Sequence, residues 1–177
     1  MKKLLLTALA ILVVLAMVPV VQAQTAQDNA TVTATINTAL GITKNTDVDF
    51  GGVQQGSTPV LDPQGTGHSQ VGAGAVVGDF SVTGTNGAVV VVTYTGATLE
   101  DASANTLTFT SDLSWDASAG NQASSTDIAS GNTITLGASG ATLWLGGSLG
   151  DLTGQAAGAY STATGGGSPV TVTVEYQ

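Results

Sequence analysis

The chain ends in a segment whose apolar and polar residues alternate strictly. Val170, Val172, Val174 and Tyr176 fall on one side of this segment, and the residues between them, two threonines and a glutamate, fall on the other. A period of two residues is typical of a β-strand with one buried face. We therefore expect a C-terminal strand whose four apolar side chains face a core.

A second alternating segment lies near the other end, over residues 30–36. Its apolar side carries Val32, Ala34 and Ile36, and its polar side carries threonines. Two interpretations remain open. The segment is either the first strand of a self-contained domain or a strand that the chain donates to a neighbour, in which case these three residues and the C-terminal row are the assembly residues.

The region between these ends consists of short β-branched runs separated by Gly- and Asn-rich turns. The predicted strands cover residues 30–37, 40–43, 48–50, 59–63, 79–84, 88–95, 106–115, 132–136, 141–149 and 158–163, before the final one. Asn86-Gly87 predicts a tight hairpin, and the apolar run Val89–Val92 predicts a strand buried on both faces. Gly165–Ser168 is expected to be a flexible connection. Many short strands with regular turns predict an all-β, immunoglobulin-like Greek-key β-sandwich.

The first 23 residues have the pattern of a secretory signal peptide. Basic residues at Lys2 and Lys3 precede an apolar run that ends in small residues at Ala23. A membrane anchor is the alternative, but Pro19 and the absence of a following basic cluster favour cleavage. The expected organisation is a signal peptide over 1–23, an extension with the candidate donor strand over 24–37, and a β-sandwich domain over 38–177. The protein is expected to be exported, passing through the periplasm to the cell surface or the medium.

The charge of the chain excludes several classes of partner. Once the signal is removed, Lys44 is the only lysine, there is no arginine, and twelve acidic residues remain. Such a chain repels nucleic acid and anionic lipid, so we expect no nucleic-acid partner and contact with a membrane only through the signal. The sequence has no cysteine, which excludes disulfides and thiol chemistry.

Candidate metal ligands are sparse. His68 stands alone in a Gly-rich loop, and Asp47 and Asp49 flank a valine where they could hold calcium. A solvated face explains the two aspartates more simply. We expect no metal and no cofactor.

The remaining candidates concern carbohydrate chemistry. Asp112 and Asp116 flank Trp115 and could be imagined as a glycosidase pair, and Trp115 and Trp144 could stack on sugar rings. Tryptophans in a β-sandwich more often fill the core. We expect no enzymatic activity, and a monomeric carbohydrate-binding or adhesive β-sandwich is the alternative function.

Several short motifs resemble a family of uncharacterised bacterial secreted domains, domain of unknown function 4402. They are Leu40-x-Ile42-Thr43-Lys44, Asp47-x-Asp49-Phe50-Gly51, Pro59-Val60-Leu61-x-Pro63-x-Gly65, Phe80-x-Val82-x-Gly84, Gly146-Gly147-x-Leu149, Gly158-x-Tyr160 and the closing Val170-x-Val172-x-Val174-x-Tyr176. Each motif is weak alone, and together they cover most of the chain after the signal.

The same layout resembles the pilin subunits of chaperone–usher fimbriae. That resemblance implies an incomplete sandwich whose missing strand comes first from a periplasmic chaperone and then from the extension of the next subunit. It implies that residues 30–36 act as the donor and residues 170–176 as the edge of the acceptor groove. The expected function is therefore a non-enzymatic, fimbria-like or surface-displayed structural subunit, whose partners are other copies of itself or related subunits.

The signal-peptide prediction can be tested by mass. Intact-mass analysis of exported protein should give a chain that begins at Gln24, because the small residues before it suit a signal peptidase. A membrane-bound product that retains residues 1–23 would contradict the prediction.

Overall fold

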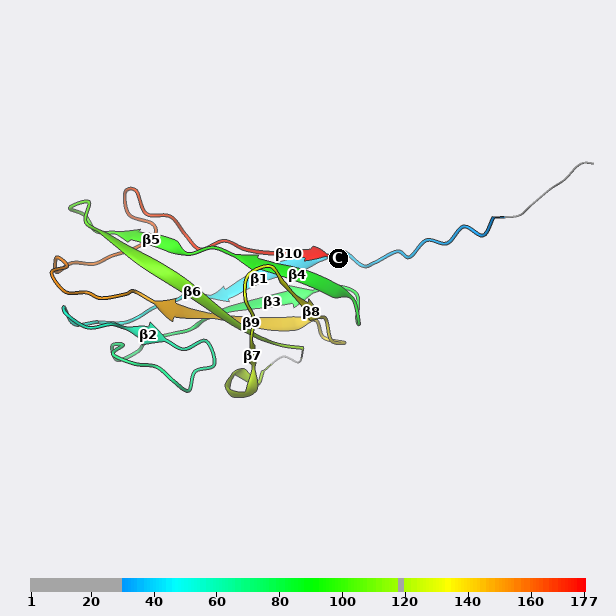
Figure 1. Ribbon diagram of the computed structural model, residues 1–177, viewed down its shortest axis with the longest axis horizontal. Helices are drawn as coiled ribbons and strands as arrows, with labels where there is room; N and C mark the ends of the chain where they lie inside the picture. The colour runs from blue at the N-terminus through cyan, green and yellow to red at the C-terminus, as the bar shows by residue number, and fades with distance from the viewer. Residues whose placement is uncertain (1–29, 118–119) are drawn as a thin grey trace, which may run out of the picture. The chain divides into compact units, whose positions relative to one another are not determined.

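A computed structural model describes residues 30–117 and 120–177 of the chain (Figure 1). Its strands are β1 (Gly41–Thr46), β2 (Val60–Leu61), β3 (Gly78–Thr83), β4 (Val89–Tyr94), β5 (Ala97–Glu100), β6 (Thr106–Asp116), β7 (Thr126–Asp127), β8 (Asn132–Thr135), β9 (Ala141–Ser148) and β10 (Val172–Tyr176), with one 3-10 turn, η1 (Gln122–Ser124). The predicted signal peptide lies outside the described residues.

The strands form two antiparallel sheets. The larger sheet has the order β1-β3-β9-β6-β5, and the short strands β2 and β7 pair with β9 and β6. The smaller sheet has the order β10-β4-β8. One hydrophobic cluster draws side chains from both sheets, so the sheets pack face to face as a β-sandwich. This confirms the predicted all-β class.

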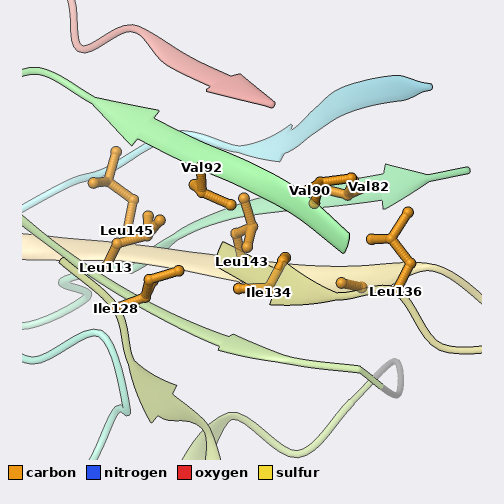
Figure 2. Close-up of a cluster of buried hydrophobic side chains, with 10 residues drawn as sticks. Val82, Val90, Val92, Leu113, Ile128, Ile134, Leu136, Leu143 and Leu145 are labelled. Carbon is orange, nitrogen blue, oxygen red and sulfur yellow. The ribbon is translucent and has the colours of Figure 1, made fainter. Parts of the chain in front are cut away.

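The main core lies between β4 and β8 on one side and β3, β6 and β9 on the other. Figure 2 shows Val90 and Val92 of β4 and Ile134 of β8 packed with Leu143 and Leu145 of β9. All five are buried. Burying a side chain of this size contributes about 1.5–3 kcal/mol, so this contact holds the two sheets together.

A second hydrophobic cluster fills the part of the domain around β2 and β5. It contains Phe50, Leu61, Phe109, Leu149 and Leu152. The rings of Phe50 and Phe109 meet edge to face with their centroids 5.8 Å apart, a geometry that aromatic quadrupoles favour. Loops on both sides of β2 therefore contribute side chains to this cluster.

Two adjacent glycines allow the crowding around β9. A Cβ on Gly146 would lie 2.1 Å from the carbonyl oxygen of Leu61. Gly147 has a φ of 144°, and a Cβ there would lie 2.1 Å from the carbonyl oxygen of Thr110. No other residue fits at these positions, because β2 and β6 approach the backbone of β9 from opposite sides.

The predicted hairpin at Asn86-Gly87 is wrong. Gly87 does have a positive φ of 77°, as a tight turn requires. However, β3 before the turn belongs to the larger sheet and β4 after it belongs to the smaller one. Val82 and Val90 both reach the core from opposite layers, so the turn connects two sheets instead of two paired strands.

Three other strand predictions also need correction. Residues 30–40 form no strand, and residues 158–163 contribute only an isolated pairing of Ser161 with Glu100. Residues 48–50 likewise form only one bridge, between Asp49 and Val76. In each case no neighbouring strand among the described residues extends beside the segment.

Two predictions about local environment are corrected as well. β4 is buried on one face only, because Val89 is exposed and Val91 is half-buried. The connection Gly165–Ser168 is held against β5, since the Gly166 N–H donates to Glu100 and Ser168 pairs with Thr98. The close approach of Glu100 is possible because Gly165 and Gly166 have no side chains.

The core assignment can be tested with a matched pair of substitutions. Leu143 is 0% exposed and Val89 is 38% exposed. Leu143→Ala should lower the free energy of unfolding by about 2–5 kcal/mol, because it leaves a cavity in the main core. Val89→Ala should lower it by less than about 1 kcal/mol. Urea denaturation measures both, and equal losses would contradict the proposed packing.

Candidate assembly site

One side of the sandwich carries two strand edges that pair with no other strand in the described residues. β1 pairs only with β3, and β10 pairs only with β4. The two strands belong to different sheets, and they contact each other at this side of the molecule (Figure 1). We call this side, formed by β1 and β10, the open side.

The opposite side of the sandwich is closed by the chain itself. After β7 the backbone crosses from the larger to the smaller sheet, and the Ile128 N–H donates to the Leu113 carbonyl at 2.9 Å. The Tyr94 hydroxyl donates to the Ile128 carbonyl at 2.9 Å, and Ser130 bonds both main-chain groups of Tyr94. A crossing segment thus covers the core on this side, whereas none of the described residues forms such a segment beside β10.

The C-terminal row faces the core, as the alternation predicted. Val172, Val174 and Tyr176 of β10, together with Val170 just before it, pack against the main cluster but remain half-buried. Glu175 is exposed. The four apolar side chains therefore pack against the sandwich without being fully covered.

The facing strand, β1, has a different edge. Ile42 of β1 and Leu40 before it are half-buried against the main cluster. Farther along, the pairing register shifts between Lys44 and Thr46, and Lys44 forms an exposed ion pair with Asp47. A bulge and a charged lysine are devices that discourage strand addition, so β10 is the more receptive edge.

A groove continues the open side beyond the start of β10. Its volume is ≈ 560 Å³. Its apolar lining comes from both clusters and includes Val48, Phe50, Phe80, Leu145, Tyr160 and Val170. The lining also includes the charged Lys44 and Asp47 and the polar Ser161 and Thr162. A groove with apolar positions beside an unpaired strand edge can accept the alternate side chains of an extended peptide.

The N-terminal segment has the complementary property. Val32 is 91% exposed and Ile36 is 93% exposed, and Ala34 between them is also exposed. These are the three residues that the sequence pattern places on one side. Transfer of a valine or isoleucine side chain from water into an apolar site is worth about 1.5–3 kcal/mol, so the segment has free energy to gain from a partner.

The Tyr176 hydroxyl makes a set of contacts that the sequence did not predict. It accepts a hydrogen bond from the Thr85 N–H at 2.8 Å and donates one to the Thr38 carbonyl at 2.8 Å. Hydrogen bonding to the Thr85 hydroxyl contributes to a lowered pKa of Tyr176. These contacts could have been predicted from the tyrosine at the end of the apolar row, because a buried tyrosine ring needs a hydrogen-bond partner for its hydroxyl.

The candidate metal ligands have local structural roles. The Nδ1 atom of His68 accepts a hydrogen bond from the Asp62 N–H at 3.0 Å. Asp47 pairs with Lys44, and Asp49 accepts from the Gly51 N–H at 2.7 Å. Across residues 30–117 and 120–177, no three His, Cys, Asp or Glu side chains gather in a group that could hold a metal ion.

The geometry does not favour the carbohydrate candidates. Asp112 and Asp116 lie four residues apart on β6, and a strand rises about 3.3 Å per residue, so their backbones are roughly 13 Å apart. Glycosidase carboxyl groups lie about 5–9.5 Å apart. Trp144 is only 6% exposed, and Trp115 is half-buried against the main core. The tryptophans are occupied with packing.

Comparison with known proteins gives no relative from which a function can be transferred: neither a family model nor a curated protein matches the chain. Among the residues that the structure describes, no helix has the length and apolar character needed to cross a membrane. A proposal about function therefore has to be based on the geometry of the open side.

One charged group on β6 allows a test by pH. The Asp112 side chain is exposed, yet its partial desolvation, followed by the negative charge of Asp127, raises the pKa of Asp112 above its usual value. The folded chain therefore holds this proton more tightly than the unfolded chain does, so ionised Asp112 costs stability once the pH is above the raised pKa. Asp112→Asn should raise the melting temperature at pH 7, and the gain should disappear near pH 3, below about 3.9, where both states are protonated. A gain of equal size at both values would contradict this assignment.

Proposed function

We propose that the protein is a non-enzymatic, exported structural subunit that assembles by β-strand addition, with an immunoglobulin-like, pilin-like sandwich as its body. The observation that carries the proposal is the combination of an open side and an unpaired alternating extension in one chain. β10 offers a free edge with half-buried apolar residues, and residues 30–36 offer exposed apolar residues at the matching period of two.

Strand addition explains why both features persist in a soluble chain. Main-chain hydrogen bonds along β10 provide affinity, and alternate side chains that enter the open side set the register. Val32 and Ile36 would be buried by the same event that covers Val170, Val172 and Val174. The extension and the open side therefore each cover exposed apolar surface of the other.

The charge distribution is compatible with association of like chains. The chain is strongly acidic, so two copies repel each other at long range. Residues 29–43 contain no charged side chain. The extension can therefore approach an acidic neighbour without adding to the repulsion, and the partners we propose are further copies of this chain or related subunits.

An exported subunit with an open side also needs protection before it assembles. An uncovered strand edge beside apolar residues is prone to non-specific pairing. A periplasmic chaperone that lends a strand to β10 would supply this cover, as the resemblance to pilins implies. We therefore propose such a chaperone as a transient partner and the cell surface as the final location.

Deletion and rescue test the proposal. A chain that lacks residues 24–37 should fold, because the described part of this segment, residues 30–37, takes no part in the two core clusters, but it should no longer form multimers in size-exclusion chromatography. A synthetic peptide of residues 30–37 should then raise its melting temperature. At a concentration of 100 Kd the expected stabilisation is about 2.7 kcal/mol.

The matched control is the same peptide with Asp in place of Val32 and Ile36, which should give no stabilisation because a buried unpaired charge is costly. A wild-type protein that stays monomeric at all concentrations, with residues 30–36 protected from hydrogen exchange, would refute assembly and favour a self-contained sandwich.

A further inference from the structure

The turn between β3 and β4 contains two neighbouring residues that can react with each other. Asn86 and Gly87 are both exposed there, and a Cβ on Gly87 would meet no atom within 4 Å. Of the seven asparagines in the chain, only Asn86 is followed by glycine. The others precede Thr, Ala or Gln, whose side chains crowd the following main-chain nitrogen. Asn86 is therefore the asparagine most open to attack by the nitrogen of its neighbour.

The reaction open to this pair is the loss of ammonia, which makes asparagine a thermolabile residue. The Gly87 nitrogen gives up its proton and bonds to the side-chain carbonyl carbon of Asn86, which closes a five-membered imide ring. The bond from that carbon to the side-chain nitrogen breaks, and this nitrogen leaves with the proton as ammonia. Water then opens the ring at either carbonyl and leaves aspartate or isoaspartate at position 86. The reaction requires only water and a free N–H on Gly87.

In the folded chain the N–H of Gly87 is not free. It donates to the Leu136 carbonyl at 2.8 Å, and the Leu136 N–H donates to the Ala88 carbonyl at 2.9 Å. These two bonds continue the pairing of β4 with β8 beyond Val89 and Thr135. Base removes the proton of a main-chain N–H only after its hydrogen bond has opened, which is also the condition for hydrogen exchange.

The turn is also held at its first residue. The Ala88 N–H donates to the Thr85 carbonyl at 3.1 Å and closes the turn. The Thr85 N–H donates to the hydroxyl of Tyr176 in β10 at 2.8 Å. A Cβ on Gly84 would lie 2.7 Å from that hydroxyl, so the backbone before the turn packs closely against the tyrosine. Tyr176 therefore opposes movement of the turn away from β8.

We propose that Asn86 is a site of spontaneous conversion to aspartate and isoaspartate, and that the hydrogen bond from Gly87 to Leu136, supported by Tyr176, restrains the reaction until the turn opens. The inference does not depend on the proposed function, because it concerns a turn within one chain.

The conversion has a structural consequence. Isoaspartate directs the main chain through the former side chain and lengthens it by one carbon atom, so the N–H groups of Thr85 and Gly87 cannot both return to their partners. The end of β10 then loses a hydrogen bond at Tyr176. Protein converted in urea and then refolded should therefore melt at a lower temperature than unconverted protein.

The test compares folded wild-type protein with the same protein in concentrated urea, both in mildly alkaline buffer. Mass spectrometry of peptic peptides, with fragmentation that separates aspartate from isoaspartate, follows position 86. Conversion should be at least about tenfold slower in the folded protein, because opening of a hydrogen-bonded turn costs free energy. Asn105 and Asn132, which both precede threonine, should convert far more slowly than Asn86 in urea and serve as internal controls.

A matched pair of substitutions tests the contribution of Tyr176. Tyr176→Phe keeps the ring but removes the acceptor for the Thr85 N–H. Conversion of Asn86 in the folded protein and hydrogen exchange of the Gly87 amide should both become several-fold faster. Tyr94→Phe removes a hydroxyl bond to the Ile128 carbonyl at the other end of β4 and should leave both rates unchanged.

Three results would overturn the inference. Asn86 that stays intact in urea is not a modification site. Equal conversion in folded and unfolded wild type would show that the bond to Leu136 restrains nothing, and this comparison decides the matter even where a variant does not fold. Rates that are unchanged in Tyr176→Phe, or that rise equally in Tyr94→Phe, would show that Tyr176 does not hold the turn.

Discussion

The packing of a three-stranded sheet on a wider one is the constraint on which the rest of the structure depends. Val90, Val92 and Ile134 pack the smaller sheet against side chains of β3, β6 and β9 in the main core. Because the smaller sheet has only three strands, it cannot cover the full width of the larger one. Its two margins, which are the edges at β8 and at β10, must therefore be covered by other segments.

The two margins are completed in different ways. Beside β8 the chain crosses between the sheets and bonds Ile128 and Ser130 to their neighbours, so that margin is internal. Beside β10 the described residues supply no such segment, and the last apolar row stays half-buried. The difference between these margins is a physical reason to regard β10 as an acceptor edge and not merely as the last strand.

The margin beside β10 also explains the packing and the hydrogen bonds of Tyr176. Its ring completes the apolar row of β10, and its hydroxyl reaches the backbone at Thr38 and Thr85. One side chain thus connects the end of the chain to the beginning of the domain without any disulfide. In a chain free of cysteine and with one lysine after the predicted signal peptide, packing and neutral hydrogen bonds have to provide this connection.

The sequence by itself determined the features that depend on local periodicity. The alternation of Val172, Val174 and Tyr176 established a strand and the face that it buries, and the long β6 and β9 were predicted nearly to their ends. Periodicity succeeds here because it records which side of a strand meets water. It also placed Val32 and Ile36 on one side of the N-terminal segment, and the structure leaves both side chains exposed.

Only the tertiary structure decided which strands are neighbours. Asn86-Gly87 specifies a reversal of the chain, but whether the flanking strands pair or separate into two sheets depends on where the core lies. The open side and the hydrogen bond from Tyr176 to Thr38 arise from residues far apart in the chain. Local pattern carries no information about such contacts, because they are selected by the packing of whole sheets.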